Sequence, residues 1–396
     1  MEAAWKELRR DFPALEHGAY LNAAAASPPP RVVRQAVTRF YQQLEQHGDY
    51  FWEKWLEEVE GVRRTIARLV GAEPDEIAFV PNTSTGMNLV VDSIGGEGPV
   101  LSDELEFPAV TLPWIHRGTA VHFVPAIEGV LRLESFQAPY APKAATIAIS
   151  HVQFSNGCRQ DLDAFGSLKA ERHLVVCGSQ SVGAFTIDVG RSGIDALAVG
   201  GHKWLCAGYG AGFVYISRRL LETRPPRTVG WRSVEDPFAF DNRTIRLLGS
   251  NRRAELGCPS FGPIFALGAA AEYLLGIGIE RIQERVLHLN EYLTFRLERD
   301  GHTVLSPGGP HRSGQTLVAA ERPDELVGFL SERGIAVTRK PEGIRVATHF
   351  YNCEEDVDAL LAALREYGTA GSPAETPSEP GPGAAETGSG EPADPE

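Results

Sequence analysis

The chain has 396 residues, of which 43% are hydrophobic and 23% charged, and its formal net charge is −14. This acidic balance disfavours a nucleic-acid surface, which would be basic, and no apolar stretch approaches the roughly 20 residues of a membrane span. The length exceeds what one hydrophobic core usually supports, so we expect two domains.

Apolar runs typical of buried strands recur along the first part of the chain. In order they are 76–80, 98–102, 120–124, 145–150, 173–177, 196–200 and 212–217. Helical patterns fall between many of them, at 31–47, 53–70, 84–94, 108–117 and 161–171. Strand–helix alternation predicts an α/β fold with a mainly parallel sheet, here seven-stranded, covered by helices on both faces.

The pattern changes from about Phe261, where a long helical stretch (261–301) precedes short strands and a last helix, "CEEDVDALLAALREY". We therefore predict an N-terminal arm packed near the domain junction, a large domain, a smaller α+β domain and a tail. Their bounds are 1–25, 26–245, 246–367 and 368–396. The tail contains mostly Pro, Gly, Glu and small residues, a composition that predicts disorder.

The cysteines bear on the cellular compartment. There are five, at positions 158, 177, 206, 258 and 353, and none belongs to a CxxC pair. Their scatter argues against a disulfide framework or a zinc site and favours a reducing cytoplasm. The first residues mix charged with apolar side chains, so we also expect no signal peptide. We predict no metal centre and no membrane or nucleic-acid partner.

Lys203 is the only charged side chain between Asp195 and Arg218, within the apolar, glycine-rich run "DALAVGGHKWLCAGYGAGFVYIS" (195–217). The run is typical of strand, turn, strand, and a lysine is almost never fully buried without a reason. A desolvated ammonium loses its proton more easily, and the neutral amine is the nucleophile that condenses with an aldehyde. The alternative is a buried stem whose ammonium reaches water. The spacing of the residues alone does not distinguish a nucleophilic lysine from one whose ammonium reaches water.

Two further segments follow the ends of predicted strands. In "VPNTSTGMNLVV" (80–91) a helix is expected to begin near Ser84, and hydroxyls and free backbone N–H groups at its start would suit a phosphate. An ordinary N-cap without ligand is the alternative. In "VVCGSQSVGA" (175–184) a buried strand ends at Cys177, where α/β sheets bind ligands. Read alone, Cys177 also fits a small core residue.

Together these segments resemble the class V aminotransferase family of pyridoxal 5'-phosphate (PLP) enzymes, which includes cysteine desulfurases, selenocysteine lyases and isopenicillin N epimerases. The resemblance runs from "YLNAAAASPPP" (20–30) to "HFYNCEEDVDALLAAL" (349–364). "GGHKW" within apolar sequence is its most specific motif, and "RRAELGCPSF" (252–261) and "IRVATHFYN" (344–352) follow in the expected order. It implies fold type I, with a large parallel-sheet domain and a smaller α+β domain.

The resemblance also implies cofactor-binding roles. Lys203 would form the Schiff base with PLP and move the α-proton of the substrate. Thr83 and Ser84 would bind the phosphate with backbone amides, helped by His202. Gln180 would donate to the phenolic oxygen of the cofactor.

Other positions are implied to serve the substrate and a partner subunit. Arg345 matches the arginine that holds a substrate carboxylate, a role that suits a planar, bidentate donor, and Asn22 is assigned to the same substrate. A surface strand arginine is the alternative for Arg345. Cys258 lies where the family has a Thr donated across a dimer interface to the phosphate, so a homodimer is expected. Trp52, in "GDYFWEKWLEE" (48–58), is a candidate for lining the substrate pocket, with core packing as its alternative.

Several positions depart from the family pattern. Cys177 stands where an Asp pairs with the pyridine nitrogen, and a thiol is a weaker partner, which predicts a less protonated ring and less transamination. Phe107 stands where many members stack a His, so it can stack but cannot move protons. Gly200 replaces a hydroxyl residue that often touches the phosphate. Phe154 replaces an Asn of the desulfurases, and Asn156 lies two residues later.

The segment "GIAVTRKPEGIRVAT" (334–348) has no cysteine before Arg345 and no room for the loop that carries the desulfurase nucleophile. The resemblance therefore implies an enzyme acting at the α-carbon or α-amino group of an amino acid, as an aminotransferase, lyase or epimerase. Two alternatives stay open. One is a cysteine desulfurase or selenocysteine lyase, and the other is a protein that keeps the fold without catalysis.

Overall fold

The computed structural model describes residues 2–96, 98–137, 143–223 and 225–370. Within these residues a seven-stranded sheet has the order β2-β8-β7-β6-β5-β3-β4, and only β8 runs against the others. The strands are β2 (Ile77–Val80), β3 (Val100–Asp103), β4 (Val121–Val124), β5 (Thr146–Ser150), β6 (His173–Cys177), β7 (Ala196–Gly200) and β8 (Gly212–Ile216). The predicted α/β fold is confirmed, because each predicted run overlaps one of these strands.

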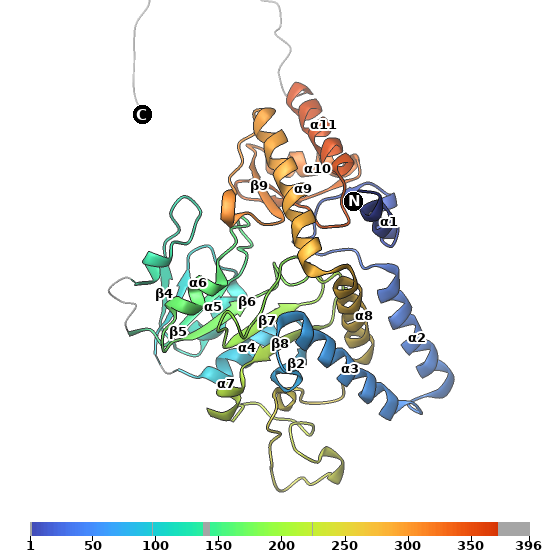
Figure 1. The fold of residues 1–396 in the computed structure, drawn as a ribbon, viewed down its shortest axis with the longest axis vertical. Helices are drawn as coiled ribbons and strands as arrows, with labels where there is room; N and C mark the ends of the chain where they lie inside the picture. The colour runs from blue at the N-terminus through green and yellow to red at the C-terminus, as the bar shows by residue number, and fades with distance from the viewer. Residues whose placement is uncertain (1, 97, 138–142, 224, 371–396) are drawn as a thin grey trace, which may run out of the picture.

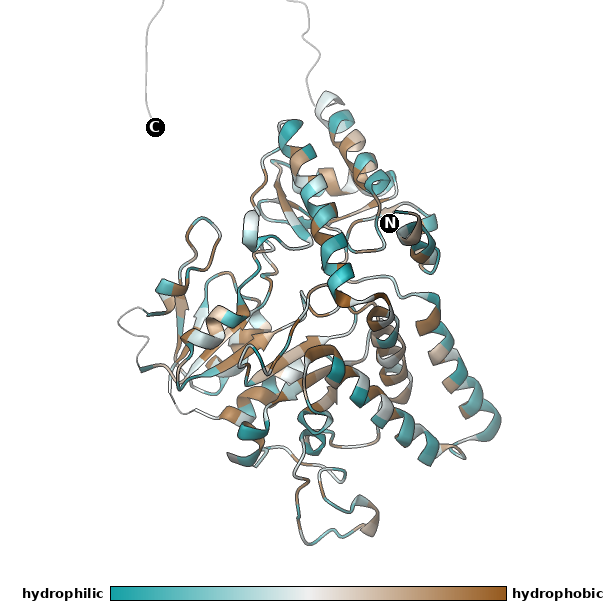
Figure 2. Ribbon diagram, in the orientation of Figure 1, coloured by the Kyte–Doolittle hydropathy of each residue, from teal (hydrophilic) through white to brown (hydrophobic). Residues whose placement is uncertain are grey.

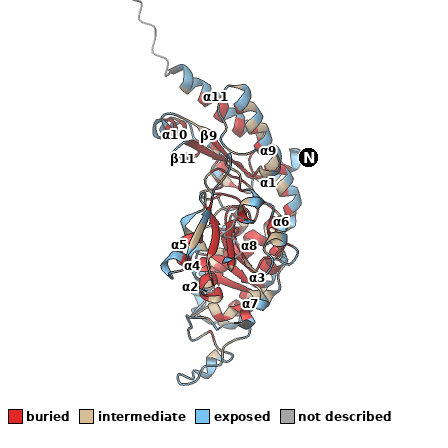
Figure 3. Ribbon diagram, turned by 90° about the vertical axis from the view of Figure 1, so that its left-hand side faces the viewer, coloured by how far each residue is buried: buried red, intermediate tan, exposed pale blue. Residues whose placement is uncertain are grey.

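Both faces of this sheet are buried except at the edge strand β4, which explains why its inner strands are largely apolar (Figure 3). The helices of the sheet region are α2 (Arg31–His47), α3 (Trp52–Val70), α4 (Thr83–Ile94), α5 (Pro108–His116), α6 (Leu162–Leu168), α7 (Arg218–Thr223) and α8 (Phe261–Ile277). Alternate strand residues pack on the two faces: Val176 and Leu197 face a core that includes α3 and α8, whereas Cys177 and Ala198 face α4 and α5.

The predicted long helix after Phe261 is two helices that meet at Gly278 with a bend of 80°. α8 is brown over most of its length in Figure 2 and packs against α2 and α3, whereas α9 (Ile279–Arg299) reaches the smaller domain. The first turns of α9, with Ile279, Ile282 and Val286, still pack in the core of the large sheet, whereas Leu293 and Leu297 lie in the core of the smaller domain. Among the described residues no single helix has the length and apolar character to cross a membrane; only the bent α8–α9 pair meets both criteria together.

The smaller domain contains a three-stranded antiparallel sheet of β9 (Gln315–Ala319), β12 (Gly343–Ala347) and β11 (Thr338–Lys340). Helices α10 (Pro323–Glu332) and α11 (Glu354–Ala370) share a core with the later turns of α9. The predicted tail therefore overlaps the end of α11, and the rest of it lies outside the described residues.

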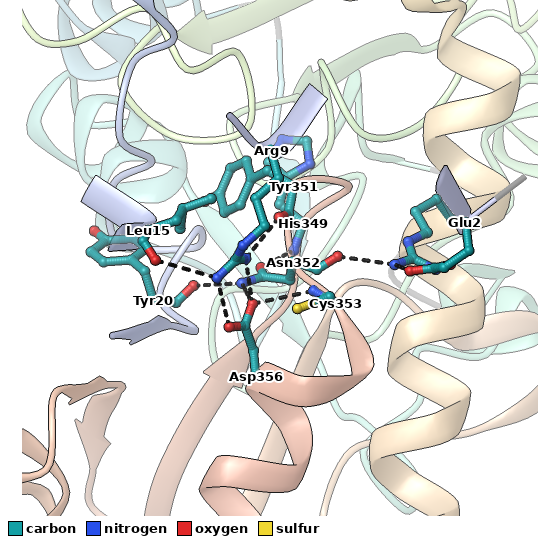
Figure 4. A network of polar contacts seen from close by, with 10 residues as sticks. Glu2, Arg9, Leu15, Tyr20, His349, Tyr351, Asn352, Cys353 and Asp356 are labelled. Carbon is teal, nitrogen blue, oxygen red and sulfur yellow. Dashed lines mark hydrogen bonds and ion pairs between the residues drawn. The ribbon is translucent and has the colours of Figure 1, made fainter. Parts of the chain in front are cut away.

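The N-terminal arm packs on the smaller domain. β1 (Ala19–Tyr20) pairs in parallel with β10 (Ile335–Ala336), and α1 (Glu2–Arg9) lies beside α11 in Figure 1. Arg9 donates to both carboxylate oxygens of Asp356, at 2.7 and 2.9 Å, and Arg285 makes a similar pair with Glu2 (Figure 4). These contacts hold the last part of the arm, including Asn22, against the end of β12.

Candidate active site

Lys203 lies in the turn between β7 and β8, at the carboxyl end of the parallel strands. Its side chain is half-buried, and its Nζ lies 5.7 Å from the centre of the Phe107 ring. No carboxylate of the described chain makes an ion pair with it. Burial lowers the pKa of the Lys203 ammonium, and the nearby Arg345 lowers it further, although Cys177 acts in the opposite direction. The ammonium therefore loses its proton more easily here than on an exposed lysine.

The start of α4 forms a polar cradle beside Lys203. Asn82 caps the helix by accepting from the backbone N–H of Thr85 at 2.9 Å. The hydroxyls of Thr83 and Ser179 lie 2.6 Å apart, and the N–H of Gly200 donates to the same Ser179 oxygen at 3.2 Å. Ser84 is exposed at the first turn of the helix. Neutral donors and a helix N-terminus suit the charge of a phosphate group.

Gly200 keeps this cradle open. A Cβ at Gly200 would lie 2.9 Å from the Thr83 hydroxyl and 3.2 Å from the His202 ring. A side chain would thus fill the space between the helix start and the turn. The glycine found here in place of a hydroxyl residue is consistent with a ligand that approaches the backbone closely.

His202 and Gln180 flank the cradle. The His202 ring stacks on Tyr209, with centroids 4.9 Å apart, and burial next to Lys203 lowers its pKa to about 4, so it is neutral at pH 7. Gln180 is buried; its amide nitrogen donates to the Ala24 carbonyl, and its oxygen accepts from Trp204. The amide nitrogen keeps one further proton to donate.

Cys177 ends β6 and is 5% exposed. Burial raises the pKa of its thiol, and the nearby Glu106 raises it further, so the thiol stays protonated. Sequence reasoning missed the Glu106 carboxylate, which accepts from the backbone N–H of Ser150, the residue paired with Cys177 across β5 and β6. Glu106 shares Gln153 with the fully buried Asp103, and burial raises the pKa of both acids, that of Asp103 to about 8.

The predicted substrate residues Arg345 and Asn22 are joined through Thr338. The Thr338 hydroxyl donates to the Asn22 side-chain oxygen and accepts from Arg345 Nη2 at 3.4 Å. Arg345 is 5% exposed, and its Nη1 donates to the Phe154 carbonyl at 3.1 Å. Its Nε has no partner in the described chain, and burial lowers its pKa to about 10. A buried guanidinium without a carboxylate is suited to an anionic ligand.

Two aromatic rings cover the space between Lys203 and Arg345. Phe107 is 41% exposed, and its ring meets Phe154 edge-on with centroids 5.0 Å apart. Asn156, the other residue considered at the Phe154 position, donates to the Gly129 carbonyl and accepts from the Cys158 backbone instead. The replacement of Asn by Phe thus makes this wall of the pocket apolar.

Trp52 and Cys258 lie in other surroundings. Trp52 starts α3 and packs edge-on against Phe261 with centroids 5.3 Å apart, within the aromatic cluster between α2, α3 and α8. Cys258 is exposed and lines a cavity of about 220 Å³ that also includes Thr85 and Glu255. In this single chain, no direct contact joins either residue to Lys203.

The parts of this site fit PLP. Lys203 supplies an amine for the aldehyde, the α4 cradle supplies donors for the phosphate, and the Phe107 ring is placed to cover an aromatic ring. Over the described ranges, no group of three or more His, Cys, Asp or Glu side chains is arranged to hold a metal ion. A lysine after a strand of a doubly wound sheet, facing an anion cradle, defines the class of PLP-dependent enzymes of fold type I.

Comparisons with known proteins give the particular family. The model of the family "Aminotransferase class-V" matches residues 19–360, so the chain belongs to that family and is a PLP-dependent enzyme acting on amino acids. A relative from Bacillus subtilis, the "Uncharacterized aminotransferase YcbU", is 29% identical over 90% of this chain and 96% of its own. A cysteine desulfurase of Salmonella gallinarum is 28% identical over 91% of this chain and 97% of its own.

Solved structures show the same fold. The apo cysteine desulfurase of Thermococcus onnurineus NA1 superimposes with a TM-score of 0.84 at 24% identity, over 92% of this chain and 98% of that one. A lysine-to-alanine variant of C-DES, with glycine covalently linked to its PLP cofactor, gives a TM-score of 0.83 at 23% identity, over 90% of this chain and 98% of that one.

Proposed function

We propose that this enzyme acts at the α-carbon of an amino acid, with Lys203 as the catalytic residue, and that it is a lyase or epimerase rather than an efficient transaminase. The observation behind this is the position of Lys203, half-buried and without an acidic partner, between the α4 cradle and Arg345. PLP, when bound, withdraws electrons from the α-carbon of the amino acid attached to it.

The chain's own groups account for the remaining tasks. The Lys203 amine is the nucleophile for the aldehyde and, once released, the base that accepts the α-proton at Nζ. Arg345 binds the substrate carboxylate, with its guanidinium oriented by the Thr338 hydroxyl and the Phe154 carbonyl. Thr83, Ser84 and the backbone of α4 bind the phosphate. Phe107 and Phe154 exclude water from the reacting carbon, which strengthens each of these polar contacts.

Cys177 supports the choice of reaction. The thiol is buried and its pKa is raised, so it offers a weak, neutral hydrogen bond where an aspartate would offer a charge. Transamination would depend most on electron withdrawal by the ring, to which a charged residue at the position of Cys177 would contribute. Elimination of a leaving group, or return of a proton to the α-carbon, requires less electron withdrawal by the ring.

Sulfur transfer is the second candidate, because curated relatives bear the name cysteine desulfurase. The segment before Arg345 argues against it: β11 and β12 form a hairpin with a tight turn, and residues 334–348 contain no cysteine. Of the described cysteines only Cys258 is exposed, and it lies in the cavity beside Thr85. A scaffold without catalysis is the third candidate, with Cys177 as its support.

We also propose that two copies of this chain form the functional unit in the cytoplasm. The segment between α7 and α8, part of which forms the loop at the bottom of Figure 1, contains the exposed Trp231, Phe238 and Phe240, and the Trp231 ring contacts both phenylalanine rings. Exposed apolar patches of this kind mark interaction sites. A second copy would bring Cys258 toward the partner's phosphate cradle. Light scattering of wild type and Phe240→Ser tests the assembly, and a monomeric wild type would overturn it.

The test of the proposed function is the visible absorbance of the purified protein, beside Lys203→Ala, before and after addition of an amino-acid panel. We expect a yellow wild type whose lysine-linked band is absent from Lys203→Ala. A colourless wild type that stays colourless after PLP is added would remove Lys203 from the role proposed here.

Exchange of the substrate α-proton in D₂O, followed by NMR, separates the candidates. We expect exchange in wild type for the amino acids that change the band, with release of an oxo acid or inversion at the α-carbon identifying a lyase or an epimerase. Formation of alanine from cysteine, with sulfide released when dithiothreitol is added as the reductant, would favour the desulfurase instead. A spectral change without exchange for any amino acid would favour the scaffold without catalysis.

A further inference from the structure

One face of the β11–β12 hairpin presents two cationic side chains. Thr338 lies opposite Arg345, and Lys340 lies opposite Gly343 in this antiparallel pair. Side chains alternate along a strand, so Thr338, Lys340 and Arg345 share one face. The Cα atoms of diagonal neighbours such as Lys340 and Arg345 lie about 7 Å apart. Arg339, on the other face, pairs with Asp324.

This face is turned toward Lys203. The Lys340 Nζ lies 4.3 Å from the centre of the Phe154 ring, Phe154 meets Phe107 edge-on, and Phe107 lies under the Lys203 Nζ. Arg345 donates to the Phe154 carbonyl from the other side. Three cationic groups therefore surround one apolar wall, and an amino acid bound beside Lys203 would lie among them.

No ion pair joins any of these three cations to a carboxylate of the described chain. Other arginines that are buried in the described chain do form such pairs. Glu342, in the hairpin turn, is exposed and makes no ion pair with Lys340. Burial, together with the neighbouring Arg345 and Lys203, lowers the pKa of Lys340 to about 8, although Glu342 acts in the opposite direction. Holding such charges together without a counter-charge is costly, and a bound anion would remove that cost.

We propose, on the basis of the proposed function, that the substrate is an amino acid whose side chain ends in a second anionic group, and that Lys340 binds this group while Arg345 binds the α-carboxylate. Lys340 and Arg345 carry two positive charges, whereas one α-carboxylate supplies a single negative charge, so a second anionic group is needed to balance both. A substrate with a neutral side chain would leave the half-buried Lys340 without a partner. Lys340 is therefore a specificity-determining residue.

The test is a titration of the purified holoenzyme, followed by the absorbance of its cofactor. The acidic ligands are L-aspartate, L-glutamate, L-cysteine sulfinate and O-phospho-L-serine, which separate carboxylate, sulfinate and phosphate; L-asparagine and L-glutamine are neutral controls of equal shape. We expect wild type to bind its best acidic ligand at least tenfold more tightly than the matching amide. Lys340→Met should lose that preference, and its affinity for the amides should stay unchanged.

Arg339→Met is the matched control, because it removes a cation from the same strand on the opposite face. It should keep the full preference for acidic ligands, as should Lys340→Arg, which retains the charge if Lys340→Met fails to fold. Equal or tighter binding of the amides by wild type, with the absorbance still responding, would overturn the substrate class and leave the proposed function intact. No response to any amino acid would overturn both.

Discussion

Buried cations occupy two regions of this molecule, and their surroundings differ. In the framework, Arg9, Arg63 and Arg285 each meet a carboxylate: Asp356, Glu255 and Glu2 respectively. In the pocket, Lys203, Lys340 and Arg345 meet rings, a carbonyl and a hydroxyl, but no carboxylate of the described chain.

The difference separates two uses of the same kind of residue. A cation with a buried acid beside it is neutralised by the chain and fixes one segment to another. A cation without one raises the energy of the free protein and lowers that of a complex with an anion. Substitutions in the framework should therefore affect stability, and substitutions in the pocket should affect binding.

The largest effect should come from Arg63→Ala. Arg63 is 1% exposed, donates to both oxygens of Glu255 and to the Ile77 carbonyl, and so fixes the 252–258 loop to β2. Its removal leaves a carboxylate short of partners, and we expect a loss of about 3–5 kcal/mol in the free energy of unfolding, measured with urea.

Arg68→Ala is the control for this prediction. Arg68 lies in the same helix and pairs with Glu272, but both side chains are more than half exposed, at 61% and 58%. Its removal should change stability by less than about 1 kcal/mol. Similar losses for the two variants would contradict the distinction between buried and exposed pairs.

Arg345→Ala should show the opposite behaviour. We expect the affinity for amino acids, from cofactor absorbance, to fall about 10- to 150-fold, because a charged hydrogen bond contributes about 1.5–3 kcal/mol. The urea midpoint of the ligand-free protein should stay the same or rise, since an unneutralised buried charge is removed. A clear loss of stability with unchanged binding would place Arg345 in the framework instead.

His349 shows a third arrangement, a buried base kept neutral. It is fully buried, its Nδ1 accepts from the Phe350 N–H, and burial lowers its pKa to about 4. The unfolded chain therefore binds more protons than the folded one between about pH 6.5 and pH 4, so stability falls as the pH falls through that range.

The His349 share of this loss should be about 2 kcal/mol between pH 7 and pH 5. Urea titrations at both pH values, for wild type and His349→Gln, measure it. The variant should be less stable at pH 7, and its stability should depend less on pH. An undiminished pH dependence in the variant would assign the effect to other groups.

A smaller loss, about 1–2 kcal/mol, is expected for Asp356→Asn. Asp356 is buried and accepts from Arg9, Asn352 and the Cys353 backbone, but Arg9 keeps some contact with water. Asp358→Asn, in the same helix and half exposed, should change stability by less than about 0.5 kcal/mol. Thermal or urea unfolding measures the loss of stability in each variant. Equal losses would show that Asp356 does not stabilise the fold through its buried contacts.

The sheet was predictable because most of its strands are buried on both faces and therefore form largely apolar runs between polar turns. The same logic found Lys203, Cys177 and the start of α4, which all follow strand ends. The bend at Gly278 was missed because apolar spacing continues across it, although the positive φ of 95° there favours glycine.

The substrate side was only partly predictable. Asn22 and Arg345 followed from the resemblance, whereas Lys340 and the packing of Phe154 against Phe107 were not foreseen. These residues meet because the hairpin folds back over the large sheet, and no local pattern records a contact between residues so distant in sequence. Glu106 was overlooked for a simpler reason: an acid beside Phe107 is equally compatible with an exposed loop.

The pairing of β1 with β10 joins residues 19–20 to residues 335–336. During synthesis at about 5–20 residues per second, the first strand emerges about 15–60 seconds before its partner exists. The large sheet can form in that interval, but Asn22 cannot take its place beside Thr338. A ribosome-bound chain that ends before residue 335 would therefore hold a complete phosphate cradle and no carboxylate clamp, so the nascent protein gains its cofactor site before its substrate site.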